Sequence, residues 1–183
     1  GPTMINVIRA SWALLLGMFL LQIGNGLQGS LMGVRGAIEG FTTFELSLIA
    51  SAYFVGFLGG SRFAPVFIAK VGHVRVFAAL GSFMSAGLIA YTLMAEPWAW
   101  TILRILLGFC MSGIYVTAES WLNNASTNET RGKVLSAYMI AQTLGIISAQ
   151  GLLTLGDAAG AGLFIGASIL VSMVLISISP LTM

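Results

Sequence analysis

Two charged residues lie inside one long apolar stretch of this sequence, and they share a face. Arg104, Gly108, Met111, Tyr115 and Glu119 follow one another at intervals of four, three, four and four residues. These intervals place all five on one stripe of an α-helix. A charged side chain in the middle of a bilayer costs at least about 2.5–3.5 kcal/mol and persists only where it is paired or faces water. We therefore expect this helix to have one polar face, directed away from lipid.

Each of the two charges has two interpretations, because the helical rise separates them by about 22 Å and prevents a direct pair. Arg104 either serves an anion or a proton in a central cavity or is a structural arginine that bonds the first helix. Glu119 either takes part in proton coupling or anchors a gate at the cytoplasmic end of its helix. We favour the gate, because basic residues lie within reach of that end. The basic residues expected in this charge network are Arg62, Lys70, Arg75 and Arg131.

Side-chain amides in two other apolar stretches could act together with Arg104. Gln22 and Asn25 share a helical face near the amino terminus, and Gln142 lies on a stripe with Tyr138. Amides inside a membrane suit a ligand-lining surface and a helix–helix contact equally well. The residues predicted to line a substrate cavity are Gln22, Asn25, Arg104, Tyr115 and Gln142.

The elements that must position these residues follow from the composition. Hydrophobic residues make up 57% of the chain, charged residues 8%, and the mean hydropathy is +0.96, more than a water-soluble domain of this length could bury in one core. A membrane-spanning helix needs about 20 apolar residues, so the chain divides into six stretches. A β-barrel is disfavoured because the stretches are continuously apolar and lack alternation. The predicted all-α membrane fold has six transmembrane helices, at about 11–34, 43–70, 76–94, 97–122, 134–155 and 160–179.

The basic residues predict an orientation in the membrane. They gather at the amino terminus and at the second and fourth connections, which share one side of the membrane. These residues are Arg9, Lys70, Arg75, Arg131 and Lys133. The positive-inside rule makes that side cytoplasmic, and six spans then put both termini there, in what we expect to be a bacterial inner membrane. Residues 1–3 look like the scar of a cleaved expression tag, which leaves 4–183 as the transmembrane domain.

A weak internal repeat suggests how the six stretches are organised. The sequence before Tyr53, with Gly60 seven residues after it, is echoed at Tyr138 and Gly145. A three-helix unit that is repeated once must be inverted in the membrane, and inverted repeats are common in secondary transporters. Within the second stretch, Gly56 and Gly60 form a small-residue pattern that predicts close helix packing.

These features together resemble the amino-terminal half of a major facilitator superfamily transporter. Arg104 followed by Gly108 is similar to the family's motif in helix four, whose arginine is associated with proton-linked transport. Residues 69–75 resemble the basic loop after helix two, although Ala69 stands in place of the family's aspartate and Pro65 in place of its first glycine. The resemblance implies two inverted three-helix repeats and a substrate that binds between two six-helix halves.

The resulting hypothesis is a secondary transporter domain that moves a small solute by alternating access, with or without coupled protons. It would act with a second six-helix half, either another copy in a homodimer or the carboxyl-terminal part of a longer chain. The alternative is a non-transporting membrane scaffold or sensor subunit. An enzyme is not expected, because no metal-ligand set, nucleophile–base pair or phosphate loop is visible. We expect no cofactor and no nucleic-acid partner, and membrane lipid surrounds the domain.

Overall fold

The chain folds into long helices without strands in the part that the computed structural model describes, which is residues 4–155 and Ile169, with side chains from residue 11 to 154 and at Ile169. The helices are α1 (Met4–Ile38), α2 (Thr43–Val71), α3 (His73–Leu93), α4 (Pro97–Ala125) and α5 (Arg131–Leu155). The segments long and apolar enough to cross a membrane are Ser11–Ile38, Thr43–Val71, His73–Leu93 and Pro97–Ala125. The prediction of an all-helical membrane protein is therefore confirmed. The sixth predicted stretch, 160–179, falls outside the described residues except for Ile169, so the count of six stays a prediction.

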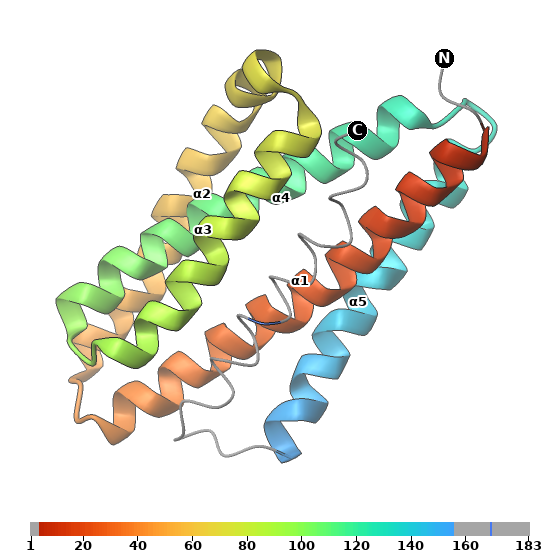
Figure 1. Ribbon diagram of the computed structural model, residues 1–183. Helices are drawn as coiled ribbons and strands as arrows, with labels where there is room; N and C mark the ends of the chain where they lie inside the picture. Colours follow the sequence, from red (N-terminus) through yellow and green to blue (C-terminus); the bar gives the residue numbers. More distant parts are fainter. Residues whose placement is uncertain (1–3, 156–168, 170–183) are drawn as a thin grey trace.

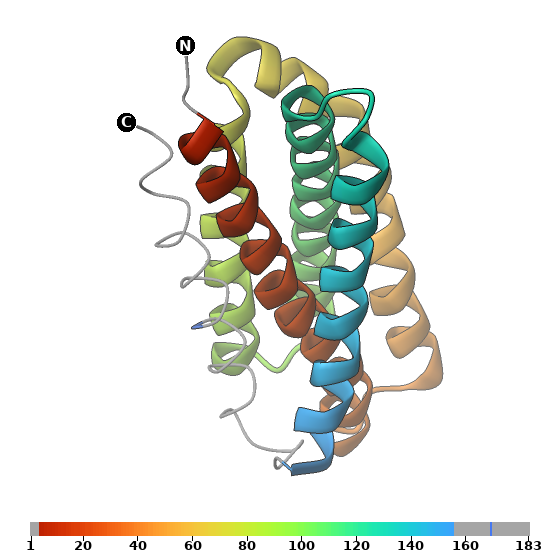
Figure 2. The ribbon, with the colours of Figure 1, turned by 90° about the vertical axis from the view of Figure 1, so that its right-hand side faces the viewer.

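Successive helices run in opposite directions along the molecule (Figures 1 and 2). The beginning of α1, the α2–α3 connection and the α4–α5 connection lie at one end, and the α1–α2 and α3–α4 connections lie at the other. The basic regions of the sequence thus gather at one end, as the sequence indicated. That this end faces the cytoplasm stays a prediction.

Local capping chemistry determines where several helices begin. The Thr42 hydroxyl accepts a hydrogen bond from the Glu45 amide at 3.1 Å, and the Glu45 carboxylate accepts one from the Thr42 amide at 2.9 Å. This reciprocal capping box satisfies two amides that the first turn of α2 leaves unbonded. Gly72, with φ of 90°, lets the chain turn within one residue between α2 and α3. α1 extends beyond the predicted 11–34 at both ends. The prediction marked only the apolar residues, whereas a helix continues as far as its backbone hydrogen bonds do.

α2 and α4 approach each other backbone to backbone. A side chain at Gly56 would overlap the carbonyl oxygen of Ile105, and one at Gly60 would overlap that of Phe109. Gly108 on α4 lies equally close to the carbonyl of Tyr53. The predicted close packing at the α2 glycines is confirmed.

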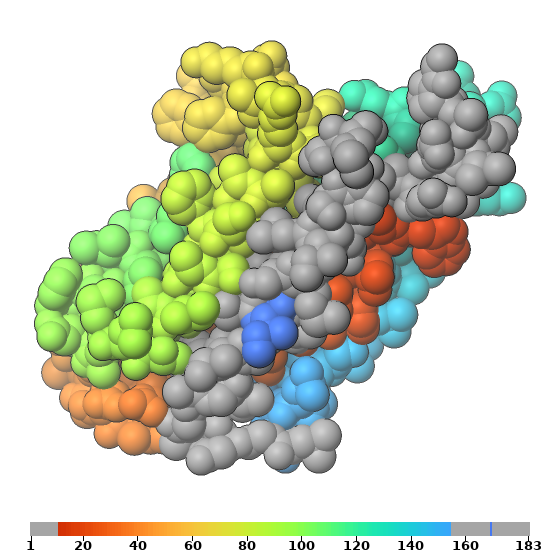
Figure 3. Space-filling model, in the orientation of Figure 1, coloured from red at the N-terminus to blue at the C-terminus, as the bar shows by residue number. Residues whose placement is uncertain are grey.

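α1 packs along α5 on the other side of the molecule. A Cβ atom added to Gly26 would lie 2.8 Å from the Cβ of Ala149, and one added to Gly145 would lie 2.6 Å from the carbonyl oxygen of Phe19. In Figure 3 the first part of α1 and α5 are on the right, and α3 with the start of α4 is on the left. The described helices thus form two groups, α1 with α5 and α2 with α3 and α4.

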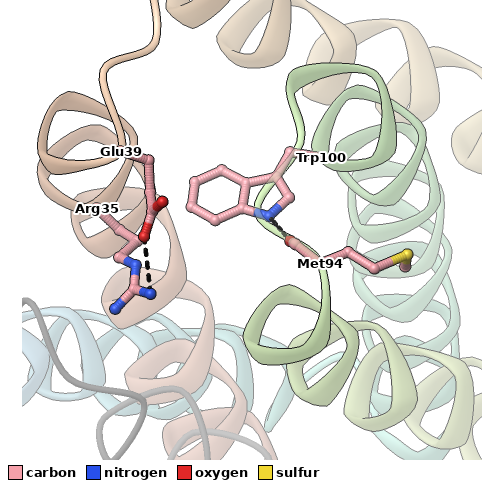
Figure 4. A network of polar contacts seen from close by, with 4 residues as sticks. All are labelled: Arg35, Glu39, Met94 and Trp100. Atoms are coloured by element: carbon pink, nitrogen blue, oxygen red, sulfur yellow. Dashed lines mark hydrogen bonds and ion pairs between the residues drawn. The ribbon is translucent and has the colours of Figure 1, made fainter.

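The end of α1 meets the turn between α3 and α4. The indole nitrogen of Trp100 donates to the carbonyl of Met94 (Figure 4). The Trp100 ring also packs edge-on against Phe41, at 5.2 Å between centroids. Arg35 and Glu39 form an ion pair at 2.9 Å in the last turn of α1. The contact between Phe41 and Trp100 thus joins the α1–α2 connection to the start of α4, at the end opposite the basic connections.

Candidate functional site

Arg104 lies where α4 meets both α1 and α2. Its Nη1 atom donates a hydrogen bond of 2.6 Å to the Gln28 Oε1 atom on α1. Its guanidinium carbon lies 4.3 Å from the centroid of the Tyr53 ring on α2, a cation–π contact. Among the described residues no acidic side chain forms an ion pair with Arg104. The guanidinium is thus positioned by a neutral amide and a ring, and no carboxylate of the described part neutralises its charge.

Asn25 on α1 joins Arg104, Gln28 and Tyr53 in a first polar group. Its Oδ1 atom accepts a hydrogen bond of 2.9 Å from Gln28 Nε2 and a longer one, 3.5 Å, from the Tyr53 hydroxyl. Gln28 therefore uses its oxygen for Arg104 and its nitrogen for Asn25. Because every member has a partner on a neighbour, these side chains are oriented before any ligand binds.

A second polar group lies nearby and joins α1, α4 and α5. The Gln22 amide nitrogen donates to the Tyr115 hydroxyl and, at 2.8 Å, to the Gln142 Oε1 atom. Gln22 is only 3% exposed. The Phe57 ring of α2 packs against Tyr115 at 6.1 Å between centroids. Gln22 and Asn25 are three positions apart on α1, a rise of about 4.5 Å along the helix axis, so the two groups lie next to each other.

The two groups lie next to each other along α1 and together form a polar seam that joins α1 to α2, α4 and α5. The structure brings all five predicted cavity residues into this seam, and it adds Gln28 and Tyr53. The polar seam consists of Gln22, Asn25, Gln28, Tyr53, Arg104, Tyr115 and Gln142. Both interpretations of Arg104 meet here, since it does bond the first helix and also carries an unneutralised charge between helices.

The residues predicted for the gate are arranged differently. Glu119 accepts a hydrogen bond of 3.2 Å from the Tyr138 hydroxyl of α5. Within residues 11–154 it forms no ion pair with any of the four basic residues proposed for it. Arg131 instead donates to Asn128 at 3.0 Å within the α4–α5 connection. Glu119 and Tyr138 border a pocket of about 610 Å³ between α4 and α5. The structure thus does not bring the proposed charge network together as direct ion pairs, and the gating role of Glu119 stays a prediction.

Of the two residues that the structure adds to the seam, Tyr53 lies on α2, a helix to which sequence reasoning assigned no cavity residue. A signal for it was present, since Tyr53, Gly56 and Gly60 are spaced by three and four residues and share a face of α2. The glycines mark the face that packs on α4, so a tyrosine on the same face must lie close to α4. What the spacing could not tell is that Arg104 would be its neighbour.

The fold and the polar seam define a polytopic helical membrane protein with bonded polar groups between its helices. The family profile of the Major Facilitator Superfamily matches residues 14–181. The chain therefore belongs to the Major Facilitator Superfamily, as its resemblance to that family implied.

The chain is also similar to bacterial transporters of this family. It is 29% identical over 142 residues to the "Uncharacterized MFS-type transporter YcaD" of Salmonella enteritidis PT4 (strain P125109), and 28% identical over 142 residues to the protein of the same name in Salmonella newport (strain SL254). Each match covers 78% of this chain and 37% of the relative. The chain thus spans well under half the length of the relatives that it matches.

Proposed function

We propose that this chain is a six-helix domain of a secondary transporter, which moves a small solute across a bacterial inner membrane by alternating access. Membership of the superfamily and the similarity to MFS-type transporters support a transport role. The observation that carries the proposal further is Arg104, oriented between α1 and α2 without an acidic partner among the described residues. Such a group suits a substrate that brings its own negative charge, or a proton-linked step.

The chemistry at Arg104 favours exchange of its hydrogen-bond partner. An anionic oxygen adds attraction between opposite charges, and a carboxylate or phosphate can accept two parallel hydrogen bonds from a guanidinium, which the neutral Gln28 oxygen does not offer. An anionic substrate oxygen would therefore replace the neutral Gln28 oxygen on the guanidinium. The released Gln28 amide could then bond the substrate or Asn25, and the remaining amides and Tyr115 would contact the uncharged part of the substrate.

Alternating access requires a second half against which this domain rocks. The 37% share of the relatives' length is consistent with a missing carboxyl-terminal half, and a homodimer of this chain is the other possibility. Among the described spanning helices α2 is the least covered, with 22% of its apolar stretch buried, compared with 50% or more in α1, α3 and α4. We propose that the second half contacts this helix, and that Glu119 anchors the gate at the end that faces the cytoplasm.

The test is substrate-dependent flux in proteoliposomes, measured with a panel of small carboxylates and phosphates, with and without a proton gradient. Arg104→Ala should abolish the flux while the protein remains folded, as judged by its elution from size-exclusion chromatography. Arg104→Lys is the matched control for charge, and Lys133→Gln is a control for an exposed basic residue outside both the seam and the predicted gate. Undiminished flux in Arg104→Ala would refute the role assigned to this residue.

The alternative of a scaffold or sensor subunit predicts a different result. Such a protein would co-purify with a partner and show no substrate-dependent flux with any member of the panel. The native mass of the detergent-purified chain, corrected for bound lipid and detergent, separates the two forms of the transporter proposal. A defined dimer favours a self-paired half, and a monomer favours a domain of a longer chain.

A further inference from the structure

An apolar groove lies on the outer side of α2, α3 and α4, away from the polar seam. Its volume is about 380 Å³. Phe67 and Val71 of α2, Phe83 of α3 and Phe109 of α4 are among its lining residues. The buried Cys110 lies in its lining as well. A groove of this composition is suited to a hydrocarbon chain.

One end of this groove carries two cations. Lys70 lies in the last turn of α2, Arg75 lies in the first turn of α3, and Gly72 turns the chain between them. Both side chains are exposed and line the groove. Across the described part of the chain, neither forms an ion pair with a carboxylate. The groove thus joins an apolar floor to two positive charges that no described acidic residue neutralises.

The depth of the groove matches one leaflet of a bilayer. Arg75 and Phe83 on α3 are eight residues apart, which is about 12 Å along the helix. Half of a hydrocarbon core is about 15 Å thick. The cations lie at the end of the molecule where the basic connections gather, and lipid headgroups meet the helices at such an end. A molecule in the groove would therefore have its polar end at the interface and its apolar end inside one leaflet.

We propose that this groove binds one anionic phospholipid, with an acyl chain between α2, α3 and α4 and the headgroup phosphate on Lys70 and Arg75. Basic pockets between transmembrane helices on the cytoplasmic side recognise anionic headgroups in this way. An apolar protein segment in the groove would leave both cations without a partner, and a small soluble anion would gain nothing from the apolar floor. The lipid site is separate from the seam around Arg104 and does not depend on the proposed transport.

The test counts retained lipids on the whole chain. The protein is reconstituted in nanodiscs with equal amounts of phosphatidylglycerol and phosphatidylcholine and then transferred to detergent, and the bound lipids are identified by native mass spectrometry. The wild type should retain one phosphatidylglycerol and no phosphatidylcholine. The double variant Lys70→Gln with Arg75→Gln should bind phosphatidylglycerol about 30-fold more weakly, since each cation near the surface contributes roughly a factor of five.

Two controls separate this groove from general electrostatic attraction. Arg131→Gln with Lys133→Gln removes two charges at the same end of the molecule, outside the groove lining, and should leave retention unchanged. Ala79→Phe fills the groove from an exposed position and keeps both cations, so it should also abolish retention, whereas Ala50→Phe, exposed elsewhere on α2, should not.

Several outcomes would overturn the proposal. Equal retention of the two lipids would show that charge is not recognised. Unchanged retention in the Lys70 and Arg75 double variant, or in Ala79→Phe, would show that the lipid binds elsewhere. An equal loss in the Arg131 and Lys133 variant would mean that any basic residue at this end suffices. The measurement needs no transported substrate, so failure of the transport proposal would not affect it.

Discussion

The α2–α4 interface and the polar seam join helices by opposite means. At the α2–α4 interface, Gly56, Gly60 and Gly108 let the backbones touch, so that no side chain separates them. In the seam, long polar side chains bridge helices whose backbones stay further apart, as Arg104 of α4 does towards Gln28 of α1. Lipid supplies no hydrophobic driving force between helices, so contact of small residues and interhelical hydrogen bonds are the two means available.

This difference separates the fixed part of the domain from the adaptable part. Backbone contact at a glycine tolerates no added atom, because a carbonyl group cannot rotate away. A side-chain amide can rotate and change its partner while remaining bonded. We therefore expect the α2–α4 interface to behave as a rigid unit, and exchange of partners to be concentrated in the seam.

The largest expected effect is at the rigid interface. Gly56→Ala forces a Cβ atom into the carbonyl of Ile105, so it should destabilise the protein by about 3 kcal/mol or more. Gly33→Ala is the matched control, since a Cβ there meets nothing within 4 Å, and helix propensity alone predicts a gain of up to about 1 kcal/mol. Thermal unfolding in detergent measures both. Equal midpoints for the two variants would contradict the assignment of α2–α4 as a backbone contact.

The next effect concerns the ring beneath Arg104. Tyr53→Leu removes the cation–π contact, which is worth about 1–2 kcal/mol at a partly desolvated site. Tyr53→Phe keeps the ring and loses only the 3.5 Å bond to Asn25, so its unfolding midpoint should stay close to that of the wild type. If the two variants lose equal stability, the hydroxyl and not the ring supports Arg104.

A smaller effect is expected between α1 and α5. A double-mutant cycle of Gln22→Leu and Gln142→Leu should give a coupling free energy of about 0.6 kcal/mol, the average for interhelical hydrogen bonds in a membrane. The cycle is measured by reversible unfolding in mixed detergent. A coupling close to zero would show that the seam contributes orientation but no stability at this pair.

The smallest effect tests the end of α4. Tyr138→Phe removes the hydroxyl that donates to the exposed Glu119, and should change stability by about 0.5 kcal/mol, the low end for a hydrogen bond, because the exposed carboxylate can bond water instead. If Glu119 anchors a gate, the same change should alter transport more than stability, and Arg131→Gln should act in the same direction. Transport that is unaffected by both variants would argue against the gate.

Much of the fold could be predicted because its causes are local. Each apolar stretch that predicted a helix within the described residues corresponds to one, since a chain in lipid must bond its own backbone. The helix ends were less accurate, as at the fifth helix, where Arg131 begins α5 three residues before the predicted start at 134. Apolarity gives the span, whereas backbone hydrogen bonds and capping give the ends.

The candidate site could be predicted as a set of residues but not as a set of contacts. Helical spacing gave the faces that carry Gln22, Asn25, Arg104 and Tyr115, and the structure places these faces together. Spacing could not give Tyr53 as the ring beneath Arg104, nor Tyr138 as the partner of Glu119 in place of a basic residue. A position on a face leaves open which neighbouring helix that face meets.

The sequence by itself determined that this protein is a helical membrane protein of the Major Facilitator Superfamily, and which residues face inward on each helix. Composition and helical periodicity depend on near neighbours along the chain, so they can be read from the sequence alone. Tertiary structure alone decided the partners, as with Gln22 and Gln142, which are 120 residues apart and meet at 2.8 Å. That contact depends on how closely Gly26 and Gly145 let α1 and α5 approach, a distance that arises from the packing of whole helices.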